Sequence, residues 1–526
     1  MKLLKISLMA VLGLGLATTA FAAKKDKSSK KDVDELPSEV FHMGKLLTPL
    51  ASIPLKTAEI VAYMPQRKKL FVVGEEKLME VVSLSNPEKP KVEGAMRLAG
   101  HGSSVTVNGD YIAVSEIADV DGDSGYVEIF RFEKDAPKRL GTYRVCPQPD
   151  MITYTPDGKM LLAACEGSPN KDFTEDPDGG VAIITRGLPI EAFPDSFPMV
   201  VYFAGFENLD STALAAKGVR MVGPNSFSQS LEPEYITVSD DSKMAWVSLQ
   251  ENNAIAKIDL SERGIYDVFA LGTVDHSKPG FGIDVRNNGE IQIENLPIHG
   301  LRQPDGIAHF SVGDKHYIVT ANEGAPVNDY EDWTDVTDAL SLFEKNRLEE
   351  SAFDGKTLSK IGKLSVSSLE RCDALWGKCP YVHSFGTRSI SIFDGETGEL
   401  VWDSGDQIEQ MLAKVAPKYF NWNAKKNKRK KDNRSGDKGC EPENVVVGNL
   451  GKHRVAFVGL ERMSGIVVFN LTNLEKPKIV DYYMDTKDRG PEGLLFIDAE
   501  HSPIPGQALL VVGYEYSKTL TIYKVR

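Results

Sequence analysis

The sequence lacks the short motifs that mark the common hydrolases and zinc proteins. Its five cysteines form no C-x-x-C pair, and its nine histidines form no H-E-x-x-H. No G-x-S-x-G is present, although Gly100-His101-Gly102-Ser103 places a serine near a histidine. These absences argue against a structural zinc module, a zinc metallopeptidase of that type and a serine hydrolase with a nucleophile elbow.

Positive charge is also scarce. The chain has 75 acidic residues against 61 lysines and arginines, a net charge of −14. Removing a leader that contains Lys2 and Lys5 takes the net charge to −16. Nucleic-acid binding needs a basic surface, so no nucleic-acid partner is expected. A surplus of carboxylates permits cation binding.

Long apolar runs are missing beyond the N-terminus. Lys2 and Lys5 precede the apolar stretch 8–17, and Ala20-Phe21-Ala22 is a small-x-small cleavage site. We predict a signal peptide over residues 1–22, a linker over 23–38 and a periplasmic or secreted protein without a membrane span after cleavage. An uncleaved anchor is the alternative, and the short apolar stretch disfavours it.

The few cysteines leave their pairing open. Export permits disulfides. Cys372 and Cys379 are close in what reads as a loop and could pair. Cys146 and Cys165 flank a hairpin, which makes their pairing a weaker prediction. Cys440 is then the odd one.

What the sequence does contain is a repeat. Its clearest copy is Gln148-Pro149-Asp150, a short apolar strand, the turn Pro156-Asp157-Gly158-Lys159, a second apolar strand, and Glu166. Similar phrases recur along the chain, and each ends its second strand in glutamate. The seven glutamates are Glu75, Glu116, Glu166, Glu251, Glu323, Glu461 and Glu515.

Seven such copies predict an all-β fold, a seven-bladed β-propeller that occupies residues 39–526 as one domain. The last copy ends after three strands, at Arg526. We therefore expect an N-terminal strand, around residues 40–46, to close the last blade.

The repeat also predicts which face of the propeller carries the functional residues. The acid after each proline should lie around the axis on one face, near the repeat glutamates. The largest insertions, 325–386 and 403–439, fall in connections of that face. Residues 336–353 and 407–416 read as partly helical and could roof the centre. The ring acids are Glu59, Asp150, Glu234, Asp305, Glu443 and Glu492.

Carboxylates crowded in this way must either retain protons or bind cations. Calcium is the expected ion because it prefers many oxygen ligands. The alternative is that the repeat glutamates accept hydrogen bonds from backbone N–H groups. The candidate metal ligands are Asp150, Glu166, Glu234, Glu251, Asp305, Glu323, Glu443, Glu461, Glu492 and Glu515. Asp119, Asp121 and Asp123 alternate like a calcium loop, but a plain acidic turn is the favoured interpretation.

Five basic residues lie on the same connections. Guanidinium and ammonium groups there could hold a phosphate. They could equally pair with the ring glutamates. The candidates are Arg388, Arg434, Lys438, Arg462 and Arg489.

Several phrases together resemble one known family. They are QPDGIAHF with TANEG, LEPEYITVS with LQENNA, FGTRSISIFD, and DNRSGDKG with EPENVVVG. They are similar to the choice-of-anchor I family, which includes proteins named after mesenchyme-specific cell-surface glycoprotein. The resemblance implies a large exported propeller, and some relatives are labelled alkaline-phosphatase-like or phytase-like. Cys440 stands where similar sequences usually carry proline.

Two functions are therefore expected. The first is a metal-dependent phosphoester hydrolase whose substrate is a small phosphorylated molecule. The second is a non-catalytic propeller that binds a ligand or an envelope or extracellular partner. A lactonase or quinoprotein-like oxidoreductase would rest on propeller analogy alone.

Overall fold

The structure is a computed structural model, and it describes residues 38–120, 122–186, 199–328, 330, 333–369, 378–426 and 430–526. The predicted leader, and Asp121 and Cys372, lie outside these residues. No described helix is long and apolar enough to cross a membrane.

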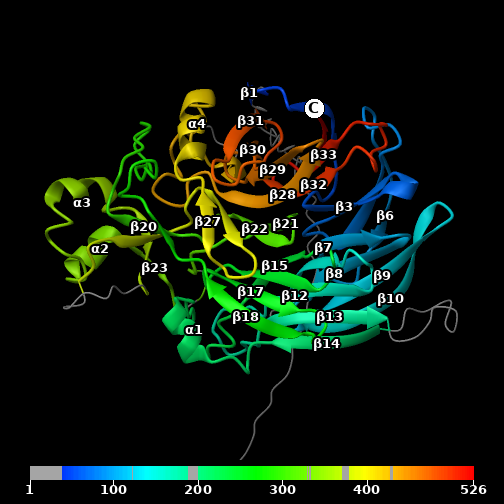
Figure 1. Cartoon of the computed structure of the whole chain (residues 1–526), viewed down its shortest axis with the longest axis horizontal. Coiled ribbons are helices and arrows are strands. Elements are labelled where there is room, and N and C mark those ends of the chain that lie inside the picture. Colours follow the sequence, from blue (N-terminus) through cyan, green and yellow to red (C-terminus); the bar gives the residue numbers. More distant parts are fainter. Residues whose placement is uncertain are drawn as a thin grey trace, which may run out of the picture. The chain divides into compact units, whose positions relative to one another are not determined.

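The described chain is built from antiparallel sheets of four consecutive strands (Figure 1). The first sheet holds β3 (Ile60–Met64), β4 (Lys69–Val73), β5 (Leu78–Ser83) and β6 (Lys91–Arg97). The second holds β7 (His101–Asn108), β8 (Tyr111–Ile117), β9 (Ser124–Glu133) and β10 (Ala136–Pro147). The third holds β11 (Pro149–Tyr154), β12 (Met160–Cys165), β13 (Gly180–Arg186) and β14 (Met199–Gly205). The fourth holds β15 (Pro233–Val238), β16 (Met244–Leu249), β17 (Ala254–Asp259) and β18 (Gly264–Ala270).

Three further sheets continue the series. The fifth holds β21 (Ile307–Val312), β22 (Lys315–Ala321), β26 (Ile390–Asp394) and β27 (Leu400–Asp403). The sixth holds β28 (Pro442–Leu450), β29 (His453–Leu460), β30 (Gly465–Asn470) and β31 (Lys478–Asp485). The seventh holds β32 (Pro491–Ile497), β33 (Leu509–Tyr514) and β34 (Thr519–Val525).

The first strands of these sheets contact one another in sequence, and β32 contacts β3. The sheets therefore form a closed ring, and the fold is a β-propeller, as the repeat predicts. Second strands are apolar on both faces because each sheet packs between two others. All six residues of β33 are buried, and Phe457 of β29 stacks on Phe496 of β32 across one such interface.

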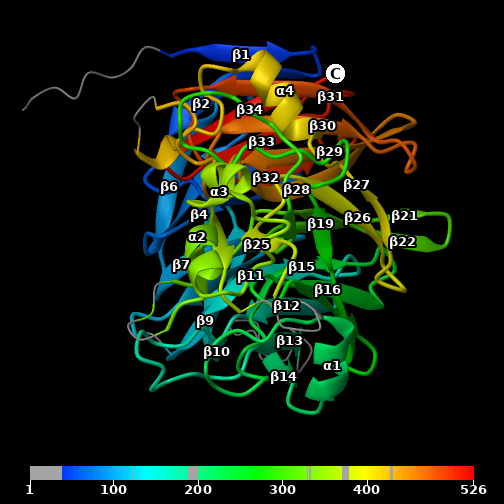
Figure 2. The same ribbon diagram turned by 90° about the vertical axis from the view of Figure 1, so that its left-hand side faces the viewer.

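An N-terminal strand closes the last sheet, but it is not the predicted one. β2 (Leu47–Pro54) pairs with β34 and supplies the missing fourth strand. The prediction that residues 40–46 take that place is wrong. β1 (Val40–Met43) instead pairs with β31 and adds a fifth strand to the sixth sheet. Figure 2 shows β1 and β31 side by side. The turn at Gly44, where φ is +86°, lets two short strands cover the open edges of two neighbouring sheets.

Within the described residues, the insertions form a small mixed sheet and four α-helices. The sheet holds β19 (Thr273–Asp275), β20 (Ile298–Leu301), β25 (Val382–Phe385), β24 (Ser365–Ser367) and β23 (Val336–Asp338), in that spatial order. The helices are α1 (Ser211–Lys217), α2 (Ala339–Glu344), α3 (Gly355–Ile361) and α4 (Gln407–Val415). Short 3₁₀ turns cover Pro65–Arg67 and Ala424–Lys426. α4 confirms the helix predicted over 407–416, and α2 accounts for part of 336–353.

A disulfide joins Cys146 of β10 to Cys165 of β12, and so links the second and third sheets. This confirms the pairing of Cys146 with Cys165, the weaker of the two predictions. Cys379 is disulfide-bonded, while its predicted partner lies outside the described residues. Cys440 is a free, buried thiol.

Candidate cation-binding site

The proline–acid pair lies at a β-bulge where the first strand of a sheet begins. Pro149, Pro233, Pro442 and Pro491 each pair with the last residue of the second strand, and the register then shifts before pairing resumes. A bulge redirects the side chains next to it. The acid that follows each of these prolines is therefore turned out of the regular alternation of the strand.

Main-chain oxygens of these acids are held by neighbouring sheets. Gly306 N–H donates to the carbonyl of Glu443 over 3.0 Å, and Gly493 N–H donates to that of Glu59 over 3.1 Å. The hydroxyl of Ser248 donates to the carbonyl of Asp305 over 2.9 Å. The backbone of the acids is thus fixed between sheets, and their carboxyl groups remain available to the centre of the ring.

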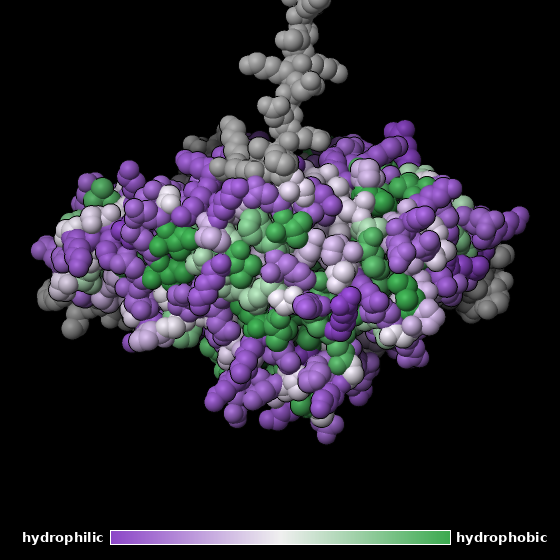
Figure 3. All heavy atoms as spheres, turned by 90° about the horizontal axis from the view of Figure 1, so that it is seen from above, coloured by the Kyte–Doolittle hydropathy of each residue, from purple (hydrophilic) through white to green (hydrophobic). Residues whose placement is uncertain are grey.

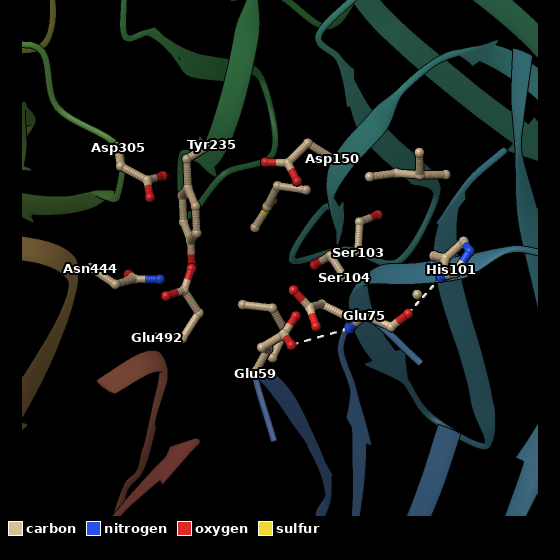
Figure 4. Close-up of a pocket in the computed structure, with 14 residues that line it drawn as sticks. Glu59, Glu75, His101, Ser103, Ser104, Asp150, Tyr235, Asp305, Asn444 and Glu492 are labelled. Carbon is tan, nitrogen blue, oxygen red and sulfur yellow. Dashed lines mark hydrogen bonds between the residues drawn. The ribbon is translucent and has the colours of Figure 1, made fainter. Parts of the chain in front are cut away.

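At the centre lies a pocket of about 580 Å³. Figure 4 shows the carboxyl groups of Glu59, Asp150, Asp305 and Glu492 around a shared space, with the Tyr235 ring among them. These residues come from five different sheets. The pocket lining contains no residue of α1 to α4. Helix α4 packs instead in the core cluster that holds Tyr419 and Trp422.

Burial and mutual repulsion raise the pKa values of these acids. Burial, and then the charges of Glu166, Asp305 and Glu59, raise the pKa of Asp150 well above its usual range. Burial, Glu323 and other carboxylates raise the pKa of Asp305 to about 7. Burial raises the pKa of Glu59 to about 7, although it accepts a hydrogen bond from the N–H of Glu75. Protons or bound cations must therefore offset the negative charge of the ring.

Three of the acids converge most closely. Oxygens of Asp305, Glu323 and Glu443 lie within 4.8 Å of one another. Glu323 and Glu443 are only 8% and 7% exposed. Oε2 of Glu443 is buried and accepts no hydrogen bond from any described residue. Burial, Glu323 and Glu492 raise the pKa of Glu443 well above its usual range. The donor set, all oxygen, fits calcium.

A second triad, Glu323, Glu441 and Glu461, also lies within 4.8 Å, but basic side chains already neutralise it. Lys438 Nζ lies 3.1 Å from Oε2 of Glu441 and also bonds to Glu323. Arg434 bonds to Glu441, and Arg462 bonds to Glu461. Burial raises the pKa of Glu441, but Lys438, Arg434 and Arg462 outweigh it and lower that pKa to about 2. Lys438 also reaches the first triad through Glu323, which both triads share, but only the second triad carries two arginines in addition, so it has less need of a metal.

The predicted phosphate ligands are engaged with the protein itself. Arg388 is 3% exposed and donates to Glu409 over 2.6 Å and to the carbonyls of Ser435 and Asp437 over 2.6 and 3.0 Å. Arg489 donates to the carbonyl of Ala424 over 2.8 Å. None of the five predicted basic residues lines the central pocket. The pairing alternative describes Lys438 and Arg462, which bond to the repeat glutamates Glu323 and Glu461. Arg434 pairs instead with Asp437 and Glu441, which belong to neither predicted set of acids.

The other predicted ligands are dispersed. Glu234 lies near the central acids: burial, Glu251 and Asp305 raise its pKa well above its usual range. Glu166 and Glu251 line a separate pocket. Burial raises the pKa of Glu515, near Lys425 and Glu75. Of the ten predicted ligands, the structure brings Asp305, Glu323 and Glu443 into one triad.

Tyr235 and Asn444 line the pocket but were not predicted. Each directly follows a ring acid, Glu234 or Glu443, and that repeated position was the signal available in the sequence. Cys440 joins neither triad, and burial raises its thiol pKa.

Comparison with known proteins decides the family. The choice-of-anchor I domain model matches residues 59–474. The chain belongs to the choice-of-anchor I family. One relative in this comparison is a mesenchyme-specific cell surface glycoprotein of Strongylocentrotus purpuratus, 30% identical over 280 residues, which is 47% of this chain and 36% of the relative. Another is gigasin-3a of Magallana gigas, 30% identical over 186 residues, 32% of this chain and 65% of the relative.

The matched segments span less than two thirds of either relative. Solved structures are more distant from this choice-of-anchor I chain. Hydrazine synthase of Kuenenia stuttgartiensis has a TM-score of 0.47 at 11% identity and covers 90% of this chain and 97% of its own. The Swd1 β-propeller of Myceliophteria thermophila has a TM-score of 0.45 at 10% identity and covers 91% and 100%. The sheets described above carry the fold assignment on their own.

Proposed function

We propose that this choice-of-anchor I chain is an exported propeller that binds a divalent cation, calcium above others, at Asp305, Glu323 and Glu443. The observation that carries the proposal is the buried, unpartnered Oε2 of Glu443 within a triad whose oxygens lie within 4.8 Å. A buried carboxylate oxygen without a donor is costly unless a proton or a cation compensates it.

The location follows from the leader and from the relatives. The sea urchin relative is named a cell surface glycoprotein, and residues 1–22 have the pattern of a signal peptide. We place the protein outside the cytoplasm, in the periplasm or beyond, where millimolar to submillimolar calcium sites are typical of extracellular modules. An envelope or extracellular protein is the partner class that this location supports.

Direct binding tests the site. Protein treated with a chelator and dialysed should take up calcium in equilibrium dialysis. Glu443→Gln removes the charge of the unpartnered oxygen and should weaken binding by about tenfold or more, since a buried charge partner is worth about 2–5 kcal/mol. Glu461→Gln is the matched control: its Oε2 is also buried without a donor, but its other oxygen pairs with Arg462 in the neutralised triad, so this variant should bind nearly as wild type.

If Glu443→Gln takes up calcium as wild type does, the calcium site lies elsewhere in the protein. A stably folded protein that takes up no divalent cation would contradict the proposal and leave a binding propeller whose carboxyls retain their protons.

Phosphoester hydrolysis is the second candidate function, and one observation favours it. Asp305 belongs both to the triad and to the wall of the 580 Å³ pocket. A phosphate in that pocket could therefore meet a cation bound next to it, and such an ion polarises phosphoryl oxygens. Since none of the predicted basic residues lines this pocket, the cation would have to be the main phosphate contact.

Turnover decides between hydrolase and binding module. A hydrolase should release p-nitrophenol from p-nitrophenyl phosphate in calcium, lose this activity in chelator and lose it in Asp305→Asn. Calcium binding without turnover on several phosphoesters would leave the binding module.

A further inference from the structure

A second pocket, of about 140 Å³, lies away from the central one. The connections over residues 166–176 and 222–232, residues 326–328, Tyr330 and Trp333, together with Glu251, form its walls. Four acids and three aromatic rings line it. They are Glu166, Asp176, Glu232, Glu251, Phe173, Tyr330 and Trp333.

Two carboxylate oxygens in this pocket have no donor. Oε2 of Glu251 and Oδ1 of Asp176 are each sealed from solvent, and neither accepts a hydrogen bond from a described residue. The remaining carboxylate oxygens are partly satisfied. Gln148 donates to Glu166, the single proton of the Ser168 hydroxyl is shared between Glu166 and, at 3.3 Å, Glu232, and Asn225 donates to the other oxygen of Asp176. Unpartnered buried oxygens on two walls point to a cationic ligand between them.

The aromatic rings form one cluster beside these acids. The centroids of Phe173 and Tyr330 lie 4.5 Å apart, and those of Phe173 and Trp333 lie 6.2 Å apart. Phe173 has φ of +56°, which a bulky residue seldom adopts. Burial, and then the charges of Glu232, Glu251, Glu166 and Asp176, raise the pKa of the Tyr330 phenol. The Tyr330 ring therefore stays neutral within reach of all four acids.

A bare metal ion suits this pocket less than the central triad. Among the described residues, three carboxylate oxygens converge within 4.8 Å only in the two triads that contain Glu323, and none of the four acids belongs to either. The nearby guanidinium of Arg220 donates to Asp335 and to the main-chain oxygen of Glu251, each over 2.6 Å. Burial and Glu166 raise the pKa of Glu251 to about 8, although the charge of Arg220 opposes that rise.

We propose that this pocket binds the ammonium head of a small organic cation, of the alkylated or quaternary kind. Aromatic faces attract such ions through their ring quadrupoles, and the carboxylates supply opposite charge. The volume is below that of an ordinary drug-sized site, so one compact head group fits rather than a whole large ligand. This site is independent of calcium binding at the centre.

Calorimetry on the full chain tests the inference, with choline chloride as the probe and chelator present to keep the central triad free of calcium. The neutral isostere of choline, in which carbon replaces the ammonium nitrogen, is the ligand control. Choline should bind and the isostere should not. Glu251→Gln should weaken choline binding by about tenfold or more and Phe173→Leu by about threefold or more, since each removes an attractive contact to the ammonium group.

Glu262→Gln, an exposed acid in the turn between β17 and β18, is the protein control and should bind choline as wild type. A melting curve for each variant checks folding, and quenching of Trp333, assigned with Trp333→Phe, gives a second readout. Equal binding of choline and its isostere would overturn the proposal. So would choline binding that Glu251→Gln and Phe173→Leu both leave unchanged, or complete competition by equimolar sodium or calcium.

Discussion

Nη1 of Arg388 lies 2.6 Å from Oε1 of Glu409, and the two side chains are 3% and 2% exposed. The pair ties the loop before β26 to helix α4. Asn421 also donates to this Glu409 oxygen over 2.9 Å, and the N–H of Asp284 donates to the other over 3.0 Å. An arginine that the sequence offers as a phosphate ligand thus holds three insertions together.

Removing one partner of this pair should destabilise the fold. Glu409→Ala leaves the Arg388 charge buried without its partner, which typically costs about 3–5 kcal/mol. Urea unfolding measures the loss. Glu399→Ala, at an exposed position in the turn before β27, should change the free energy of unfolding by less than about 0.5 kcal/mol. Equal stability of the two variants would show that the ion pair contributes nothing.

The closure by β2 makes a second prediction. Leu47 is fully buried, and its N–H donates to Asp481 of the sixth sheet over 2.7 Å. Leu47→Ala should cost about 2–5 kcal/mol. Val40→Ala in β1, where the side chain is 55% exposed, should cost little. Thermal unfolding of both variants measures the two losses. If residues 40–46 were the closing segment, Val40→Ala would destabilise the protein more than Leu47→Ala.

The disulfide between Cys146 and Cys165 makes a third prediction. Its cysteines are 19 positions apart in sequence, and a loop of that length contributes about 3 kcal/mol in the chain-entropy description. The double variant Cys146→Ala, Cys165→Ala should lose about 2–4 kcal/mol in urea unfolding. Cys440→Ala, which removes a free thiol, is the comparison for the effect of losing a buried sulfur. A loss no larger than that in Cys440→Ala would mean that the cross-link itself adds no stability.

The buried pair Glu116 and Glu128 makes stability depend on pH. Burial, and then Glu128, raise the pKa of Glu116 to about 8, against about 4.3 in an unfolded chain. Between these values the native state keeps a proton that the unfolded state has lost, so the free energy of unfolding falls as pH rises through this window. Below it both states are protonated and the effect disappears.

Urea unfolding at about pH 5, 6.5 and 8 measures this decline. Glu116→Gln can still accept the hydrogen bond from Gly100, 2.6 Å long in the native protein, but does not ionise, so its decline should be shallower. Burial and Glu166 also raise the pKa of Glu251 to about 8, so some pH dependence should remain. A variant with the same slope as wild type would exclude Glu116 as a source of it.

Much of the fold could be predicted because each repeat copy carries its own local instructions. The alternating apolar strands, the turn at Gly158 with φ of +69°, and the acid after each proline all act within one sheet. The family resemblance rests on the same phrases. The choice of closing strand was missed because β1 and β2 are similar in local pattern, and only the free edges of the sixth and seventh sheets distinguish them.

The site divides in the same way. The sequence by itself determined that acids recur at one position of the repeat, and therefore that carboxylates gather at the axis. Tertiary structure alone decided which of them converge: it brings Asp305, Glu323 and Glu443 together and places Lys438, Arg434 and Arg462 against Glu441 and Glu461. The reason is physical. Spacing along a chain sets the position of a residue within its sheet, whereas a buried charge can take its partner from an insertion more than a hundred residues away, as Glu323 takes Lys438.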